Sequence, residues 1–250
     1  MTEPRKAGKL GMIPKPLPED LGMLASYMTN PLGTPPASLT WPAAMSSCGM
    51  LGNDRFGDCT WAGAVHLRML CAAIAGEVET FPTDSDTING YLAFTHGQDS
   101  GCVEADVLKL WQTKGMFGNK LAGFAPLDIG DTDELKAATA LFGGTYIGIK
   151  VPANASAQFE AHQAWHLDDT SADDNYEGGH CVVKCGYYLD SVWGKVWAVL
   201  TWGAVQLVTE EWMAKNLLED WAVLTDEFID ARPGLIDVAA LQADLAKLAA

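Results

Sequence analysis

The stretch Gly57-Asp58-Cys59-Thr60-Trp61-Ala62 places a cysteine where a polar loop gives way to an apolar segment. Apolar residues then recur on one face at Ala62, Val65, Met69 and Ala72, which predicts a helix from Cys59 to about Ala75 with Asp58 as its N-cap. The N–H groups and the dipole at the start of a helix favour a thiolate. Cys59 is therefore a candidate nucleophile, and the alternative is a small apolar residue that begins a core helix.

A second motif, Gly178-Gly179-His180-Cys181-Val182-Val183, follows 121 residues later and places a histidine where a Gly-rich turn enters an apolar strand. Because side chains alternate along a strand, we expect His180 to face a cleft while Cys181 faces the core. An imidazole beside a thiol takes its proton and holds the resulting ion pair. His180 is therefore the candidate base for Cys59.

These motifs resemble those of the papain-like cysteine peptidases. The Cys turn is similar, although the aromatic Trp61 follows the cysteine by two places and not by one. The strand from His180 ends in Gly186-Tyr187, as in that family, and Leu200-Thr201-Trp202-Gly203 falls where the family usually has Asn-Ser-Trp-Gly. The segment from Leu135 to Ile149 is similar to the helix and buried strand that precede the His loop. More narrowly, the chain resembles uncharacterised papain-like proteins encoded by bacteriophages and bacteria.

The resemblance spans roughly residues 50–205 and implies an α+β fold, with an N-terminal helical half whose long Cys-bearing helix packs on a C-terminal antiparallel β half. It also implies roles for two further residues. Asn53, six residues before Cys59, lies where the family carries the side-chain amide of its oxyanion hole; the alternative is an Asx-turn with Asp54. Thr201 takes the place of the Asn that orients the base, and the alternative is an ordinary β-branched strand residue.

Other histidines and cysteines have less specific interpretations. His66 lies two helical turns after Cys59, too far to be the primary base, and is read as a core histidine. His162 and His166 line the cleft or belong to the surface. The chain has six cysteines, Cys48, Cys59, Cys71, Cys102, Cys181 and Cys185, which we expect to be mostly reduced. Cys181 and Cys185 lie about 13 Å apart if they share a strand, so we expect no zinc site and no cofactor.

Composition limits the possible partners. The 250 residues are 48% hydrophobic, enough for a substantial core, and 32 acidic against 16 basic residues give a net charge of −16. This charge repels phosphate backbones and anionic lipids, so neither nucleic acid nor a membrane is an expected partner. No secretory signal or spanning segment is visible. We therefore expect the chain to stay in the cytoplasm or to be packaged in a virion.

The whole chain divides into three predicted parts: a Pro-rich extended arm (1–44), a papain-like domain (45–232) and a C-terminal helix (233–250). Within the domain we expect helices over 83–96, 103–114, 133–141 and 210–218, and strands over 145–151, 180–188, 195–202, 204–209 and 221–225. A last helix is expected over 237–249. Residues 153–179 are expected to form a long acidic loop carrying Asp168, Asp169, Asp173, Asp174 and Glu177. The apolar residues of the arm predict that it packs on the body or on a neighbouring chain.

Two hypotheses from different classes follow. In the first, the protein is a papain-like hydrolase that cleaves a peptide or isopeptide bond of a protein substrate through an acyl-enzyme on Cys59. In the second, the fold is kept with reduced activity and serves as a structural or interaction component, for example of a phage particle. It then docks on other virion or assembly proteins through its arm and its acidic loop. Cys59 and His180 favour the first hypothesis, while Thr201 and Asn53 in place of the usual Asn and Gln favour the second.

Overall fold

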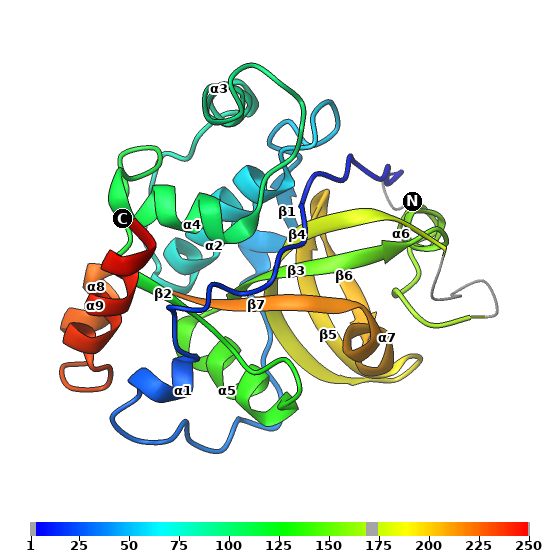
Figure 1. Cartoon of the computed structure of the whole chain (residues 1–250). Helices are drawn as coiled ribbons and strands as arrows, with labels where there is room; N and C mark the ends of the chain where they lie inside the picture. Colours follow the sequence, from blue (N-terminus) through cyan, green and yellow to red (C-terminus); the bar gives the residue numbers. More distant parts are fainter. Residues whose placement is uncertain (1–3, 169–174, 250) are drawn as a thin grey trace.

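Helices come first and strands later along most of the chain (Figure 1), in a computed structural model that describes residues 4–168 and 175–249. The helical segments are α1 (Leu24–Tyr27), the 3-10 helix η1 (Ala43–Ser46), α2 (Cys59–Ala75), α3 (Asp84–Phe94), α4 (Glu104–Thr113), α5 (Thr132–Phe142), α6 (Ala155–Glu160), α7 (Glu210–Asn216), α8 (Asp226–Ala231) and α9 (Val238–Ala249). The strands are β1 (Ser47–Gly49), β2 (Gly123–Pro126), β3 (Thr145–Pro152), β4 (Tyr176–Asp190), β5 (Gly194–Thr201), β6 (Gly203–Thr209) and β7 (Leu217–Leu224).

All the strands form one antiparallel sheet in the order β1-β6-β5-β4-β3-β7-β2. The central strand β4 is long and is buried from Gly179 to Tyr187, and α2 packs against it on one side. Figure 1 shows α2, α3 and α4 gathered on one side of the molecule and the sheet on the other. The α+β architecture predicted from the sequence, with a Cys-bearing helix against an antiparallel half, is confirmed.

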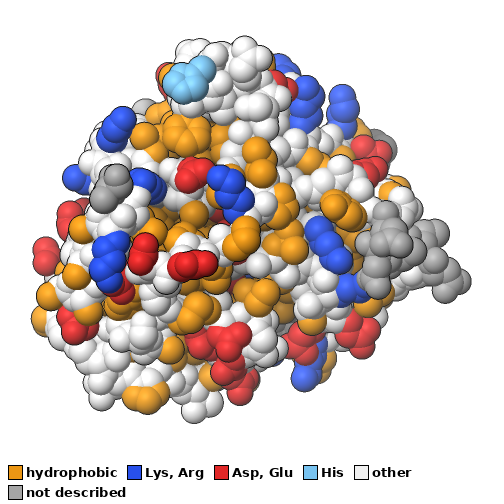
Figure 2. Space-filling model, viewed as in Figure 1, with side chains coloured by type: hydrophobic (Ala, Val, Ile, Leu, Met, Phe, Trp, Pro, Cys, Tyr) orange, Lys and Arg blue, Asp and Glu red, His pale blue; other side chains and the backbone are white. Residues whose placement is uncertain are grey.

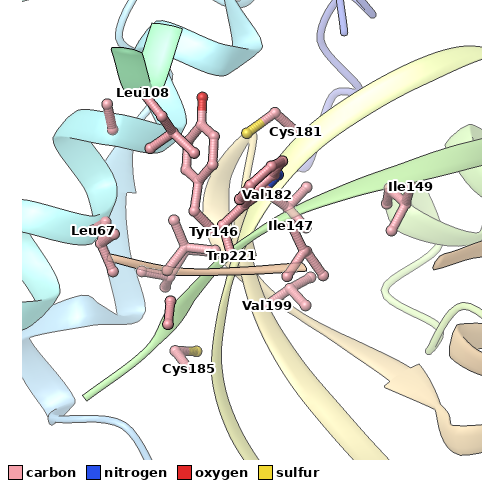
Figure 3. Packing of buried hydrophobic residues seen from close by; sticks show 14 of the residues in the cluster. Leu67, Leu108, Tyr146, Ile147, Ile149, Cys181, Val182, Cys185, Val199 and Trp221 are labelled. Atoms are coloured by element: carbon pink, nitrogen blue, oxygen red, sulfur yellow. The ribbon is translucent and has the colours of Figure 1, made fainter. Parts of the chain in front are cut away.

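Helix α2 has the predicted bounds. It ends where Gly76 takes a left-handed conformation (φ 71°) and donates its N–H to the carbonyl of Ala73. The interface between α2 and the sheet includes Tyr146 of β3, whose hydroxyl donates to the Thr60 carbonyl at 2.6 Å. Figure 3 shows Cys181 beside Tyr146, on the side of the sheet that faces the helices. These contacts fix the start of α2 against the start of β4.

Several elements differ from the sequence-based expectation. The expected acidic loop over 153–179 contains helix α6, and β4 already begins at Tyr176; Asp169, Asp173 and Asp174 lie outside the described residues. Strand β7 begins at Leu217, four residues earlier than expected, because its N-terminal half pairs with β3 through Gly148 and Glu219. The short elements α1, η1, β1, β2 and α8 were not predicted.

The arm packs on the body over much of its length, as predicted. Leu21, Leu24 and Tyr27 are buried, and the Tyr27 hydroxyl donates to Asp244 of α9 at 2.7 Å. Further along, Leu39 forms a backbone bridge with Tyr187 of β4. Figure 1 shows the dark-blue first part of the chain running between the helical side and the sheet before it reaches α1. The proposed boundaries at residues 44 and 232 stay a prediction.

The face of the molecule drawn in Figure 2 carries both acidic and basic side chains. In Figure 2 acidic and basic side chains are interspersed with hydrophobic ones, so on this face the charge of −16 is not gathered into one patch. Among the described helices, none combines the length and apolar character needed to traverse a membrane.

Candidate active site

Cys59 is the first residue of α2 and is buried, with 1% of its surface exposed. The backbone N–H of Cys181 donates to its sulfur at 3.4 Å. Asp58 is the N-cap residue, as predicted, but its side chain makes no capping hydrogen bond; its carbonyl accepts from the N–H groups of Trp61 and Ala62. The Asp58 carboxylate is buried, which raises its pKa to about 7.

His180 lies near the start of β4 and is also buried. Its Nε2 is 2.7 Å from the Thr201 hydroxyl, and its ring stacks on the indole of Trp202 with centroids 4.9 Å apart. Nδ1 has no hydrogen-bond partner among the described residues. When Nε2 carries the proton and donates it to Thr201, Nδ1 presents a lone pair, which is the state that a base requires.

Cys59 and His180 line the same small cavity, together with Met50, Asn53, Ala62, Gly63, His66, Cys181, Thr201 and Trp202. The cavity measures about 10 Å³, so it holds one water molecule at most. The structure thus brings together the four residues singled out from the sequence, Cys59, His180, Asn53 and Thr201. His66 is buried as predicted, with Nε2 2.9 Å from the Gly49 carbonyl. Its place in the wall of this cavity was missed, although its spacing from Cys59 put it on the same helical stripe.

Burial sets the charge state of the pair. Desolvation raises the pKa of the Cys59 thiol to about 12, against hydrogen bonds from the backbone of Cys181 and Gly11 that lower it. Desolvation, with a smaller contribution from His66, lowers the pKa of His180 to about 3. At neutral pH the structure therefore holds a neutral thiol beside a neutral imidazole, and an ion pair requires that the site be opened to water.

The chain's own arm lies against the loops that carry the site. Residues 8–13, called here the cleft segment, lie between the loop before α2 and the start of β4. At one end Lys9 and Asn53 exchange bonds: the Lys9 N–H donates to the Asn53 carbonyl at 2.7 Å, and the Asn53 side-chain amide donates to the Lys9 carbonyl at 3.0 Å. The same amide donates to the Phe56 carbonyl at 3.0 Å. The Asn53 side-chain amide thus donates within the chain, to the arm at Lys9 and to its own loop at Phe56.

At its other end the cleft segment bridges the two sides of the molecule. Cys102, just before α4, donates its N–H to the Gly11 carbonyl and accepts from the Ile13 N–H, both at 2.8 Å. On the opposite side the Gly179 carbonyl accepts from the N–H groups of Gly11 and Met12 at 3.2 and 3.1 Å. A side chain at Gly11 would place its Cβ 1.8 Å from the Gly57 carbonyl oxygen, so the segment approaches the Cys turn as closely as only glycine allows.

A surface hollow of about 440 Å³ runs along the cleft segment and is lined also by Asp99, Gly101, Glu177 and Gly178. Neither His162 nor His166 belongs to it: His162 is exposed and the His166 ring packs on Trp193 with centroids 4.8 Å apart. Within the described residues, no three His, Cys, Asp or Glu side chains gather in a way that could hold a metal ion.

Comparison with solved structures identifies the fold. Xylellain, a cysteine protease from Xylella fastidiosa, is similar with a TM-score of 0.65 and 14% identity over 90% of this chain and 98% of that one. Digestive procathepsin L 3 of Tenebrio molitor larval midgut has a TM-score of 0.57 and 14% identity, covering 88% of this chain and 76% of that one. The proform of the ragweed pollen cysteine protease Amb a 11 has a TM-score of 0.56 and 15% identity, covering 78% and 67%.

The chain therefore has a papain-like fold. No protein-family model matches its sequence, and comparison with curated proteins finds no relative. The narrower resemblance to phage and bacterial proteins remains a prediction.

Proposed function

We propose that this protein is a papain-like cysteine hydrolase that cleaves a peptide or isopeptide bond through an acyl-enzyme on Cys59. One observation carries the proposal: Thr201 holds one nitrogen of His180, while the other nitrogen has no partner and the ring lines the cavity that contains the Cys59 sulfur. A buried imidazole nitrogen without a partner costs free energy, which a role in proton transfer would explain.

In the proposed reaction, His180 takes the Cys59 proton on Nδ1 as the sulfur adds to the scissile carbonyl carbon. The Asn53 amide and the Cys59 N–H stabilise the oxyanion that forms. His180 then returns the proton to the leaving amine as the C–N bond breaks, which leaves a thioester on Cys59. Water attacks this thioester, and His180 passes the water proton back to the departing sulfur. Thr201 positions the ring, and Trp202 shields that hydrogen bond from water.

We further propose that this chain is latent while the cleft segment is in place. Its cleft segment covers Cys59 and occupies the Asn53 amide, so a substrate and the arm exclude each other. Two of the similar structures are described as a procathepsin and as a proform. Activity then requires that residues 8–13 leave the cleft.

A substitution that unseats the cleft segment tests this function in the full chain. Gly11→Ala forces a Cβ into the Gly57 carbonyl, and we expect the variant to hydrolyse labelled casein. The same chain with Cys59→Ala should be inactive, whereas Thr201→Ala should lower the rate only partially, by about tenfold, because it orients the base without reacting. Equal activity with and without Cys59 would refute the mechanism.

The second hypothesis, a non-catalytic component with a papain-like fold, is favoured by the burial of Cys59 and by Thr201 in the position of the usual Asn. It predicts that the Gly11→Ala variant remains inactive on casein. It also predicts that Cys59 then reacts no faster with a thiol-directed acylating probe than the other five cysteines do. Its proposed assembly through the arm, for example in a phage particle, would require the arm to contact a partner as well as its own body.

A further inference from the structure

Met12 is the residue of the cleft segment that inserts a side chain deep into the body. It is 3% exposed, while its neighbour Ile13 is 41% exposed. The Met12 side chain ends over Gly148 of β3, where a Cβ would lie 2.1 Å from Met12 Cε. The same point lies 2.8 Å from Glu219 Cγ of β7 and 3.2 Å from Glu104 Oε1 of α4. Met12 therefore fills a pocket that has two glutamates at its inner end.

These glutamates are unusual in their surroundings. Glu104 is fully buried, and neither of its carboxylate oxygens has a hydrogen-bond partner among the described residues. Glu219 is 4% exposed and accepts from the Trp221 indole at 2.8 Å. Burial, with repulsion from Glu219, raises the pKa of Glu104 well above its ordinary value, and burial raises that of Glu219 to about 7. The thioether of Met12 has no proton to donate to either group.

The arm itself shows which charge this cleft accepts. Residues 4–15 carry Arg5, Lys6, Lys9 and Lys15 and no acidic residue, in a protein with a net charge of −16. Lys9 pairs with Asp99 at 3.4 Å, and Lys15 with Asp106 at 3.7 Å. The body thus meets the basic residues of the arm with an acidic group at two separate points.

We propose that Glu104 and Glu219 are specificity-determining residues that receive a cationic side chain, Lys or Arg, of the protein substrate in the pocket now filled by Met12. This inference rests on the proposed function. The stem of a lysine follows nearly the same course as a methionine side chain and ends one atom further on, in three N–H donors. A cation there gives the partnerless oxygens of Glu104 charge-assisted hydrogen bonds, whereas an unpaired carboxylate in the same place is strongly unfavourable.

The arm allows a test that needs no hydrolysis. In the full chain, Met12→Lys and Met12→Gln both remove the methionine, but only the lysine supplies a cation. We expect Cys59 to be alkylated by iodoacetamide at least about tenfold more slowly in Met12→Lys than in Met12→Gln, because the lysine holds the cleft segment in place. In a Glu104→Gln background the difference should vanish, and Glu219→Gln serves the same purpose should the first variant not fold. Ile13→Lys, which adds a lysine at the exposed neighbour, should not slow the alkylation of Cys59 relative to the parent chain.

Substrate preference provides the second test. In the Gly11→Ala chain, we expect peptides with Arg or Lys at one position to be cleaved with kcat/KM at least about tenfold higher than peptides with Leu or Gln there. Glu104→Gln should abolish this preference, while Asp106→Asn, an exposed change on the same helix, should keep it.

The two tests separate the two proposals. If no peptide is cleaved but Met12→Lys still protects Cys59, the proposed hydrolase is wrong and the cationic pocket stands. If Met12→Lys exposes Cys59 as fast as Met12→Gln, or if neutral side chains are preferred by an active chain, the pocket binds an apolar side chain above a protonated glutamate, and the inference is overturned.

Discussion

The arm is held in two places by different means. Around α1, in residues 21–28, it is held by buried side chains: Leu24 is fully buried, and Tyr27 donates to Asp244 and accepts from the Gly22 N–H at 2.6 Å. In the cleft segment, residues 8–13, it is held mainly by backbone hydrogen bonds to Asn53, Cys102 and Gly179. Within residues 8–13 only Met12 is buried.

Residues 21–28, called here the anchor, and the cleft segment should therefore differ in how easily they leave the body. Buried apolar side chains make the α1 region part of the core, which opens only with global unfolding. Backbone hydrogen bonds in the cleft can be replaced by those of any extended peptide, because they do not depend on which side chains the peptide carries. A segment tethered by such an anchor rebinds readily, because the tether keeps its effective concentration high. We therefore expect the cleft segment to exchange while the anchor stays in place.

The largest expected effect follows from Gly11→Ala, which breaks the cleft contact and leaves the anchor intact. Because a Cβ cannot fit 1.8 Å from the Gly57 carbonyl oxygen, the segment must leave, and the Cys59 pKa must fall from about 12 toward its ordinary range. Alkylation of Cys59 at pH 7, followed by peptide mass spectrometry, should accelerate by about a hundredfold or more. Gly33→Ala is the control, because nothing lies within 4 Å of the added Cβ. An unchanged rate in Gly11→Ala would mean that the segment does not protect Cys59.

Substitutions in the anchor should lower the free energy of unfolding. Leu24→Ala empties a fully buried position, and we expect the free energy of unfolding in urea to fall by about 2–5 kcal/mol. Leu189→Ala, at a position 77% exposed, should change it by less than about 0.5 kcal/mol. A loss as small as that of the control would show that residues 21–28 are not part of the cooperative core.

A pH series sharpens the difference between the seated and unseated cleft segment. With a Cys59 pKa raised to about 12, the thiol stays protonated through pH 10, so the alkylation rate of the parent protein should rise about tenfold per pH unit from pH 7 to 10. In Gly11→Ala the rate should level off once the lowered pKa is passed, so the ratio of the two rates should shrink by about tenfold between pH 9 and 10. Parallel profiles would contradict the shift in pKa.

The smallest effect concerns a single hydrogen bond of the anchor. Tyr27→Phe removes the hydroxyl that joins α1 to Asp244 of α9 and to the Gly22 N–H. We expect a loss of about 1 kcal/mol in the free energy of unfolding, measured in urea, and no change in the alkylation of Cys59. Faster alkylation in this variant would show that the two contact regions are coupled.

The sequence predicted those parts of the fold and site that rest on local pattern. Helix α2 was predicted over about Cys59–Ala75, which are its bounds, because its apolar residues recur at helical spacing after Asp58. The contact between His180 and Thr201 was anticipated from the resemblance to the papain-like peptidases, in which an Asn at the place of Thr201 orients the base. Short elements were missed: β2 spans four residues, too few for a periodic signal, and exists because it pairs with β7.

What the sequence could not predict depends on distant parts of the chain meeting. The cleft segment binds mainly through its backbone, so its residue types gave no sign of where it lies. Glu104 was not singled out in the sequence, where it lies at the start of the helix expected over 103–114. It lies around Gly148 together with Met12 and Glu219, which are 92 and 115 positions away in the sequence, and no local pattern carries that information.

The central claim is that Cys59 and His180 form a competent pair once the cleft segment is unseated. Rapid quenching of the Gly11→Ala chain with a peptidyl nitrophenyl ester, followed by intact-mass and peptide analysis, tests it directly. The account predicts one acyl group per chain, on Cys59, which forms before steady-state release and disappears as the substrate is consumed, and whose formation is severely slowed by adding His180→Ala. Acylation spread over other cysteines, or the same rate of Cys59 acylation without His180, would contradict it.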